Sequence, residues 1–257
     1  MFDIFLACAP KDYNKLPFVV ESIIKNIEGY DKIFVCAPEM PPSEIQDKLP
    51  NDCSFHLDNN VLPGCDRSLW RFRPNWLFQQ HLKLFQQVTQ DWYLTLDCDT
   101  IINRPMKFFE NVSPIYWKGW NQFHAPYFIH MAFMIGLPKI DRRSCIADMN
   151  FIYRPIVNNI LERNEYTIES FIAKSQEVTT EFCHIGMPEL YGNYCAKYYP
   201  DFYTERFLKQ KVFNARKQHK INDLVWKEVE IKNIIEQAKK LDVDTLAIHS
   251  WLDEGDQ

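Results

Sequence analysis

The most constraining stretch of the sequence is Trp92 to Thr100, an apolar run that ends in two carboxylates, Asp97 and Asp99. Because side chains alternate along a strand, both carboxylates are expected to project from one side at the end of a buried strand. Two like charges at the edge of a core repel each other and lose hydration unless a cation neutralises them. Hard oxygen ligands of this kind suit Mg²⁺ or Mn²⁺, which also bind substrate phosphates. The run therefore predicts a metal and diphosphate site; the simpler alternative is a polar turn after a strand.

The residues before this run alternate between strand-like and helix-like patterns. Short apolar runs and a helical apolar spacing predict strands at 2–8, 32–37 and 53–57 and helices at 16–27 and 75–89. This order predicts an α/β fold with a mostly parallel central sheet and flanking helices. Ligands of such sheets bind beyond the carboxyl ends of the strands, so the loop from Cys8 to Tyr13 and the Asp pair should share one rim.

The second half of the chain is less regular. Its apolar patterns predict a strand over 124–136, helices near 152–163, 167–175, 188–198 and 228–241, and a late strand over 244–251. No repeat or linker divides the sequence, so we predict a single domain over 1–257. Within it, residues 1–104 would hold a nucleotide, and residues 105–257 would hold the other substrate and the C-terminal helices.

Composition and charge exclude several classes of protein. The net charge is −5 without a long basic run, which argues against a nucleic-acid partner. The eight cysteines include no C-x-x-C pair, which argues against a zinc ribbon or a thioredoxin-like site. The sequence has no signal-peptide pattern and no apolar run of membrane-spanning length. We therefore expect a cytoplasmic protein with reduced cysteines and no transmembrane segment.

Two motifs and a third segment give the sequence a resemblance to a known family. Residues 76–84 (WLFQQHLKL) fit W-x-x-Q-Q-x-x-K-L, and residues 96–100 (LDCDT) fit L-D-x-D-T. Together with residues 188–194 (PELYGNY), they resemble a poorly characterised bacterial and viral group of GT-A glycosyltransferases, over roughly residues 3–200. The resemblance implies a GT-A fold, a Mn²⁺ or Mg²⁺ ion, a UDP- or GDP-linked sugar donor and a glycan or lipid-linked acceptor. A membrane-bound acceptor would require peripheral contact with the membrane.

The resemblance also assigns roles to residues at the predicted rim. Asp99 would coordinate the metal directly, while Asp97 would reach it through water or hold hydroxyl groups of the donor. The residues expected to lie against the nucleoside, unless they form an ordinary strand exit, are Cys8, Ala9, Pro10 and Asp12.

Further residues are candidates for completing the metal and diphosphate sites. His249 follows a late apolar run, and many GT-A enzymes complete their metal site with a histidine near the C-terminus. Two carboxylates, one imidazole and two diphosphate oxygens would suit Mn²⁺. One of the basic residues Lys83, Arg67, Arg71 and Arg73 would neutralise the leaving diphosphate. The simpler alternatives are a core or surface histidine and a solvated helix face.

An inverting transferase also needs a carboxylate base close to the acceptor hydroxyl. Glu189 is the first candidate, because it follows Pro188 at an expected helix start, where the helix dipole favours a carboxylate. The same position is compatible with an ordinary first-turn glutamate. Asp148 is the second candidate. A retaining enzyme would need neither residue as a base, and the sequence leaves the stereochemistry open.

Two other functions fit parts of the sequence. In haloacid-dehalogenase-type phosphatases, the first Asp of a similar motif is the nucleophile, which would be Asp97 here. That class carries the motif near the start of its core domain and has a later G-D-x-x-x-D segment, which this sequence lacks. The other alternative is a GT-A fold that has lost its chemistry and binds a glycan. The intact Asp97 and Asp99 argue against that alternative.

Overall fold

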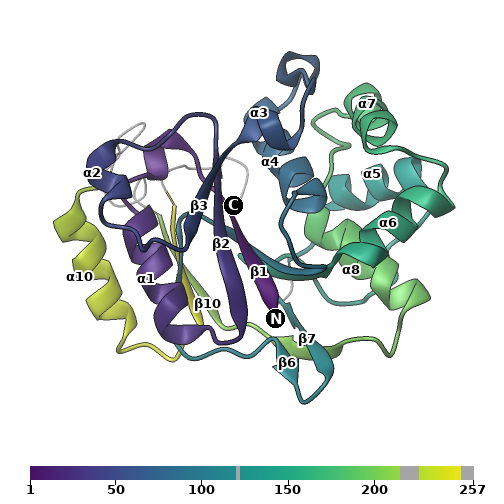
Figure 1. Cartoon of the computed structure of the whole chain (residues 1–257). Coiled ribbons are helices and arrows are strands. Elements are labelled where there is room, and N and C mark those ends of the chain that lie inside the picture. Colours follow the sequence, from purple (N-terminus) through teal and green to yellow (C-terminus); the bar gives the residue numbers. More distant parts are fainter. Residues whose placement is uncertain (120–121, 215–225, 250–257) are drawn as a thin grey trace.

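A five-stranded sheet forms the centre of the computed structural model, which describes residues 1–119, 122–214 and 226–249 (Figure 1). Its strand order is β3-β2-β1-β4-β8, with β1–β2, β2–β3 and β1–β4 parallel and β4–β8 antiparallel. The strands span Phe2–Ala7 (β1), Tyr30–Ala37 (β2), Cys53–Leu57 (β3), Trp92–Asp97 (β4) and Met149–Tyr153 (β8). The predicted α/β fold with a mostly parallel sheet is confirmed.

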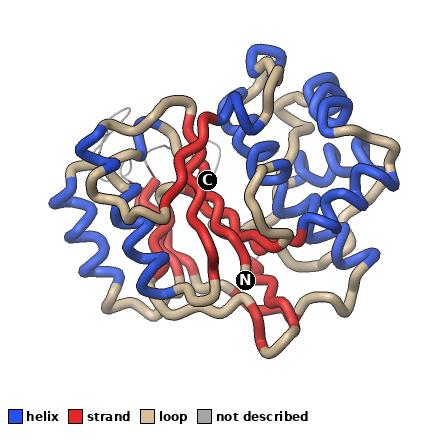
Figure 2. The backbone as a smooth tube through the Cα atoms, in the orientation of Figure 1, coloured by secondary structure: helices blue, strands red, loops and turns tan. Residues whose placement is uncertain are grey.

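Helices cover both faces of this sheet, and the side chains of β1 alternate between the two resulting cores. Phe2, Ile4 and Leu6 pack on one side with α1 and α10, whereas Phe5 and Ala7 pack on the other side with α4 to α8. All six residues of β1 are buried, as expected for a strand that is covered on both faces. Figure 2 shows the strands running through the middle of the molecule between two groups of helices.

The longer helices pack in one or the other of these two cores. They span Leu16–Asn26 (α1), Pro74–Phe85 (α4), Ala125–Ile135 (α5), Arg154–Arg163 (α6), Ile168–Val178 (α7), Met187–Tyr198 (α8) and Glu228–Ala238 (α10). Short helical turns cover Pro10–Asp12 (η1), Ser43–Gln46 (α2), Asp58–Val61 (α3) and Arg67–Leu69 (η2). The predicted helices are confirmed, with ends that differ by a few residues.

The structure also contains two small three-stranded sheets. They have the orders β10-β11-β5 and β6-β7-β9. Their strands are Thr100–Ile102 (β5), Phe109–Glu110 (β6), Ser113–Lys118 (β7), Thr204–Phe207 (β9), Gln210–Asn214 (β10) and Thr245–His249 (β11). The backbone N–H of Ile248 donates to the carbonyl of Asp99 at 2.8 Å. The late strand therefore ends beside the carboxylate motif, and its residues 250–251, also expected in a strand, lie outside the described residues.

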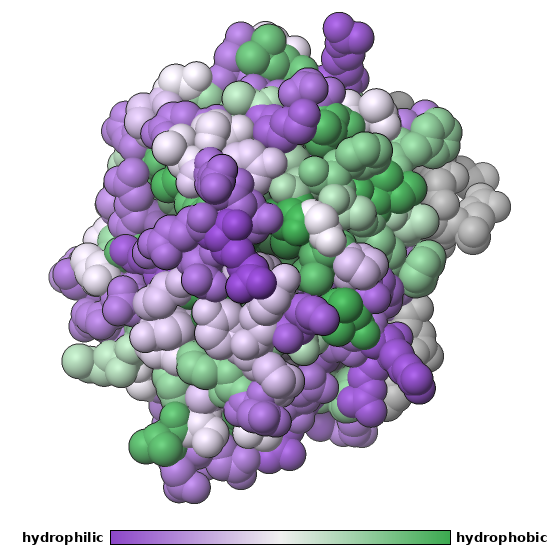
Figure 3. Space-filling model, turned by 90° about the vertical axis from the view of Figure 1, so that its right-hand side faces the viewer, coloured by the Kyte–Doolittle hydropathy of each residue, from purple (hydrophilic) through white to green (hydrophobic). Residues whose placement is uncertain are grey.

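The strand predicted over 124–136 is wrong, because this segment forms helix α5. Pro126 lies in its first turn, and Gly136 closes it in the left-handed region with a φ of 63°. Both are ordinary helix signals, but the run is apolar on every side and so lacks the polar stripe that marks a surface helix. The outer side of α5 exposes Ile129 and Phe133. Figure 3 looks onto this side of the molecule and shows an apolar area beside a hydrophilic one.

Among the described residues, no helix combines the length and apolar character that are needed to cross a membrane.

Candidate functional site

A cavity of about 640 Å³ lies at the carboxyl ends of β1 and β4. The loop after β1 and the end of β4 both contribute to its walls, as expected for the ligand edge of a parallel sheet. The sequence-predicted residues that line it are Cys8, Ala9, Pro10, Asp12, Arg67, Arg73, Asp97, Asp99 and His249. The structure thus brings together nine of the candidates, although their roles stay predictions.

The loop after β1 carries a buried ion pair that the sequence analysis missed. Asp12 lies in the short turn η1, and the Nζ atom of Lys15 is 2.7 Å from its Oδ1 atom. The Lys15 side chain is only 1% exposed, so its charge is held inside the protein close to the cavity. The spacing of three residues between Asp12 and Lys15 is the signal that would have indicated this pair.

The W-x-x-Q-Q-x-x-K-L motif lies on helix α4 and contacts the first carboxylate of the Asp pair. The Nζ atom of Lys83 is 2.5 Å from Oδ1 of Asp97, and the Nε2 atom of Gln79 donates to the same oxygen at 2.9 Å. Trp76, on the same side of the helix, lines the cavity. Gln80 points elsewhere and accepts a hydrogen bond from the backbone N–H of Met187 at 3.1 Å, where α8 begins. The two motifs are therefore parts of one arrangement in space.

Asp99 differs from Asp97 in its surroundings. The strand β4 ends at Asp97 and residues 98–99 form a turn, so simple strand alternation does not place Asp99. Asp99 is buried, and its Oδ1 atom has no hydrogen-bond partner within the described part of the chain. The pKa of Asp99 is raised to about 7, mainly by burial; Lys15 opposes this rise and Asp97 adds to it. A buried carboxylate with a free oxygen is a place where a cation would be stabilised.

Asp148 reaches this site through a pairing that the sequence did not predict. Strand β8 pairs antiparallel with β4 so that Leu96 faces Met149, and the N–H of Asp97 lies 3.4 Å from the carbonyl of Asp148. Opposite residues of an antiparallel pair share a face, so the side chains of Asp97 and Asp148 project together. The Oδ2 atom of Asp148 is buried with no partner in the described ranges. Its pKa is raised to about 7, mainly by burial, and the nearby His249 opposes this rise.

His249 ends strand β11 at the edge of the cavity. Burial lowers the pKa of its imidazole, whereas the charge of Asp148 raises it. His249 and Asp148 therefore lie close enough to affect each other's protonation. The structure places this histidine beside the carboxylates, as the resemblance to GT-A enzymes implied.

The donor set fits a hard divalent cation by its chemistry. Asp97, Asp99 and His249 line the cavity and Asp148 lies near them, and one oxygen each of Asp99 and Asp148 lacks a partner among the described residues. Oxygen and imidazole ligands suit Mn²⁺ or Mg²⁺. The side chains of residues 1–119, 122–214 and 226–249 do not, however, form a group of three or more such ligands at metal-binding distance.

A second wall of the cavity carries an Asp–Arg pair that the sequence analysis did not identify as a pair. The NH2 nitrogen of Arg67 is 2.5 Å from Oδ2 of Asp58, and the guanidinium lies 3.9 Å above the ring of Phe78. Asp58 is 3% exposed, and its Oδ1 atom has no partner in the described part of the protein. Arg67 and Arg73 line the cavity, but Arg71 does not. The pair joins α3 to η2, a contact that local sequence patterns do not indicate.

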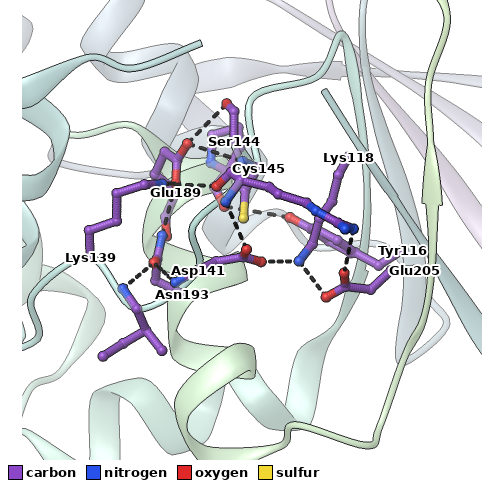
Figure 4. Close-up of polar contacts among 12 residues, drawn as sticks. Tyr116, Lys118, Lys139, Asp141, Ser144, Cys145, Glu189, Asn193 and Glu205 are labelled. Atoms are coloured by element: carbon purple, nitrogen blue, oxygen red, sulfur yellow. Dashed lines mark hydrogen bonds and ion pairs between the residues drawn. The ribbon is translucent and has the colours of Figure 1, made fainter. Parts of the chain in front are cut away.

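Glu189 is absent from the residues that line the cavity. It is fully buried near the start of α8, and its two carboxylate oxygens receive hydrogen bonds from Ser144, Cys145 and Asn193 (Figure 4). Lys139 adds an ion pair at 3.5 Å. These are the contacts of a carboxylate that holds a loop in place. The geometry therefore does not support Glu189 as the base. Asp148 is also absent from the lining, but it lies beside Asp97 and close to His249, both of which line the cavity.

Comparison with known proteins adds information on the fold. No family model and no curated protein matches the sequence. Similar solved structures include the apo form of the bifunctional glycosyltransferase WbbM, with a TM-score of 0.52 and 9% identity over 98% of this chain. The match covers 46% of WbbM, so the chain spans less than half the length of that protein.

Two further similar structures have lower scores. The galactosyltransferase LgtC in complex with donor and acceptor sugar analogs has a TM-score of 0.45 and 10% identity, over 96% of this chain and 87% of LgtC. The apo form of mouse xyloside xylosyltransferase 1 has a TM-score of 0.47 and 7% identity, over 98% of this chain and 99% of that protein. At such identities a likeness shows the fold alone. The chain has the GT-A fold that its motifs predict.

Proposed function

We propose that this chain is a metal-dependent glycosyltransferase that moves a sugar from a nucleotide-diphosphate donor to a glycan or lipid-linked acceptor. The observation that carries the proposal is the cavity at the carboxyl ends of β1 and β4, where Asp97, Asp99 and His249 lie together. Its volume of about 640 Å³ is within the ordinary range for a small-molecule site. The GT-A fold is consistent with this use of the sheet edge.

The residues of the chain would divide the binding of the donor between two walls. On the sheet side, Asp99, with Asp97 and His249, would hold Mn²⁺ or Mg²⁺, which when bound offsets the charge that builds up on the leaving diphosphate. Lys83 and Gln79 fix the orientation of Asp97 through the contacts at 2.5 and 2.9 Å. They would keep that carboxylate in place whether or not the donor is present.

On the other wall, the loop Cys8–Asp12 and the Asp58–Arg67 pair would bind the nucleoside. The free Oδ1 atom of Asp58 can accept a hydrogen bond from a ring N–H of the base. Uracil and guanine both carry such a group, so UDP and GDP donors are both compatible with this wall. Arg67 is held against Phe78 and Asp58, which leaves it with one planar face and several N–H groups for a ligand.

The phosphatase alternative finds no support in the architecture. Its nucleophile would be Asp97, whose Oδ1 atom is already held by Lys83 and Gln79. The GT-A fold also argues against it. The glycan-binding alternative without catalysis remains an outcome that the following experiment can reveal.

The test is a thermal-shift screen of UDP, GDP, CDP and dTDP, each with and without Mn²⁺, on the wild type and Asp99→Ala. Asp52→Ala, which removes an exposed carboxylate outside the cavity, is the matched control. One nucleotide at a hundredfold excess over its Kd should stabilise the wild type by about 2–3 kcal/mol, only with metal. Asp52→Ala should respond in the same way and Asp99→Ala should not.

The donor sugar follows from a second assay. Nucleotide release from UDP- and GDP-linked sugars, measured with Mn²⁺ present, would identify the accepted donor class. If no nucleotide stabilises the protein with metal, the proposal fails and the glycan-binding alternative takes its place.

A further inference from the structure

The segment from Lys139 to Ala147 has neither helix nor strand, yet it is fixed by polar contacts from several elements (Figure 4). It follows helix α5 and leads directly into Asp148 and strand β8. Loops of this kind are usually exposed and variable in position. Here Ser144 and Cys145 are buried, so their polar groups need partners inside the protein.

Helix α8 supplies most of those partners from one side. Oε1 of Glu189 accepts hydrogen bonds from the Ser144 hydroxyl at 3.1 Å and from the Cys145 N–H at 3.0 Å. The side chain of Asn193, one helical turn later, accepts from the N–H groups of Ile140 at 2.7 Å and Asp141 at 2.9 Å. Asn193 also donates to Oε2 of Glu189 at 2.8 Å. Two side chains of α8 therefore hold three backbone N–H groups of the segment.

The other side of the segment is held by charge. Lys118, at the end of β7, is 2% exposed and forms ion pairs with Asp141 and with Glu205 of β9. Figure 4 shows these three side chains meeting on the far side of the segment from Glu189. The segment is thus fixed from α8, β7 and β9 together.

Two glycines allow the segment to approach its neighbours closely. A Cβ atom on Gly192 of α8 would lie 2.3 Å from the sulfur of Cys145, and one on Gly119 would lie 1.9 Å from the carbonyl oxygen of Ile146. Neither distance is compatible with a side chain unless the backbone shifts. The residue pattern Glu189–Gly192–Asn193 therefore acts as one surface, in which the glycine gives space and its neighbours give hydrogen bonds.

We propose that Glu189 and Asn193 are positioning residues, which fix the segment 139–147 so that Asp148 stands beside Asp97, a residue of the cavity wall. The inference rests on the proposed function, in which Asp97 helps to hold the metal ion, and Asp148 supports Asp97 from behind the lining. Asp148 lies three residues after the Cys145 N–H that Glu189 holds, and it has no hydrogen bond of its own at the buried Oδ2 atom. The position of Asp148 is therefore set by the backbone on either side of it. Glu189 fixes the backbone before Asp148, and the pairing of β8 with β4 fixes the backbone after it.

The first experiment measures hydrogen exchange without donor or metal, in the wild type, Glu189→Gln and Glu189→Ala. In Glu189→Gln, the Oε1 atom can still accept from Ser144 and Cys145, but the new NH2 group would face the NH2 group of Asn193 and the ammonium of Lys139. Glu189→Gln should therefore lose only part of the protection over 139–148. Glu189→Ala should raise exchange there by about tenfold or more, while β1 and β2 stay protected. Asn193→Ala and Ser144→Ala, milder changes to the same contacts, decide the point if Glu189→Ala does not fold. Unchanged exchange over 139–148 in these variants would overturn the proposal.

The second experiment separates positioning from acid–base catalysis by transfer kinetics. Glu189→Gln should keep kcat within about threefold of the wild type, whereas Glu189→Ala should lower kcat by about tenfold or more with the donor KM within about threefold. If Glu189→Gln is as inactive as Glu189→Ala but has wild-type exchange, Glu189 acts through its charge and the proposal is wrong. If the wild type binds no nucleotide, the proposed function fails, while the exchange data still decide whether α8 fixes the segment.

Discussion

The protein has two buried acidic centres, one formed by Asp99 and Asp148 and the other by Glu189, and they differ in their hydrogen-bond partners. In the first, Asp99 and Asp148 each keep a buried carboxylate oxygen without a hydrogen-bond partner in the described part of the chain. In the second, Glu189 is fully buried and receives hydrogen bonds from Ser144, Cys145 and Asn193. A buried carboxylate without partners costs stability, whereas one with several donors stabilises the contacts around it.

This difference indicates that the first centre serves binding and that the second stabilises the fold. Asp99 lies in the cavity wall, with Asp148 close behind it, and a ligand or cation would satisfy the free oxygen of Asp99, so the cost of burying that group in the free protein is offset on binding. Glu189 has no such need, because its partners are all residues of the chain. We expect substitutions at the two centres to have opposite effects on stability.

Asp99→Asn is the change with the largest expected effect. It keeps the shape of the side chain but removes the charge, so transfer should fall by at least ~10³-fold, or about 4 kcal/mol. The free protein should not be destabilised. The pKa of Asp99 is raised to about 7 in the folded state, so folding favours the protonated form and the charged form is disfavoured at pH 8. Asparagine avoids that cost, and the free energy of unfolding at pH 8 should rise by about 1–2 kcal/mol.

Steady-state kinetics and urea unfolding at pH 8, with no metal or nucleotide in the unfolding buffer, measure these two effects. A variant that loses both activity and stability would show that Asp99 stabilises the fold, as Glu189 does, and the contrast between the two centres would fail.

Glu189→Ala is expected to have the opposite profile in stability. It removes the acceptor of the Ser144 hydroxyl and the Cys145 N–H and one partner each of Asn193 and Lys139, and should lower the free energy of unfolding by about 3–4 kcal/mol. Glu177→Ala breaks an exposed pair with Lys174 and should change it by less than about 0.5 kcal/mol. Urea unfolding of both variants gives the comparison. Equal effects would mean that the contacts of Glu189 contribute no more than a surface pair.

His81 adds a third kind of buried ionisable group, and its effect depends on pH. Its ring is buried with Nδ1 at 2.8 Å from the Leu77 carbonyl, and burial lowers its pKa to about 4. The unfolded state binds the proton more tightly, so this contribution to stability is complete above about pH 6.5 and is lost as the pH falls towards 4. The loss should reach about 3 kcal/mol. His130 and His184, whose pKa values burial lowers to about 3 and about 4, act in the same direction.

The measurement is urea unfolding from pH 7 to pH 4 for the wild type and His81→Leu. The variant should show a shallower fall in stability over this range. Parallel curves would mean that His81 is already charged in the folded protein.

Much of the fold was accessible from sequence because its central strands are local, almost continuous apolar runs. Strands β1, β2 and β4 could be recognised one at a time, and their parallel order follows from the helices between them. Strand β8 could not, because its five residues run directly into α6 and read as one helical pattern. Helix α5 was misjudged because it is apolar on every side.

The candidate site shows the same division. Asp97, Asp99 and the loop after β1 were found, since the end of a buried strand and the residues after it are adjacent in sequence. Asp58 and Arg67 were not identified as a pair, because only tertiary packing joins them. The sequence also could not rank Glu189 against Asp148. Burial and hydrogen-bond partners decide between those two, and both depend on contacts 44 or 45 residues apart in the chain.

Gly192→Ala sharpens the comparison with the smallest change, a single methyl group at the structural centre. The new Cβ atom would lie 2.3 Å from the sulfur of Cys145, so either α8 or the segment 139–147 must move. Overpacking of this kind should lower the free energy of unfolding by about 1–3 kcal/mol. Gly64→Ala is the control, because its backbone also disfavours a side chain, with a φ of 75°, but nothing lies within 4 Å of the added atom. Its cost should be about 1 kcal/mol.

Urea unfolding measures the loss of stability in both variants, and transfer kinetics distinguish them further. Gly64→Ala should leave kcat unchanged, whereas Gly192→Ala should lower kcat because Asp148 follows the displaced segment. A Gly192→Ala variant with lower stability and wild-type kcat would mean that the two acidic centres are independent of each other.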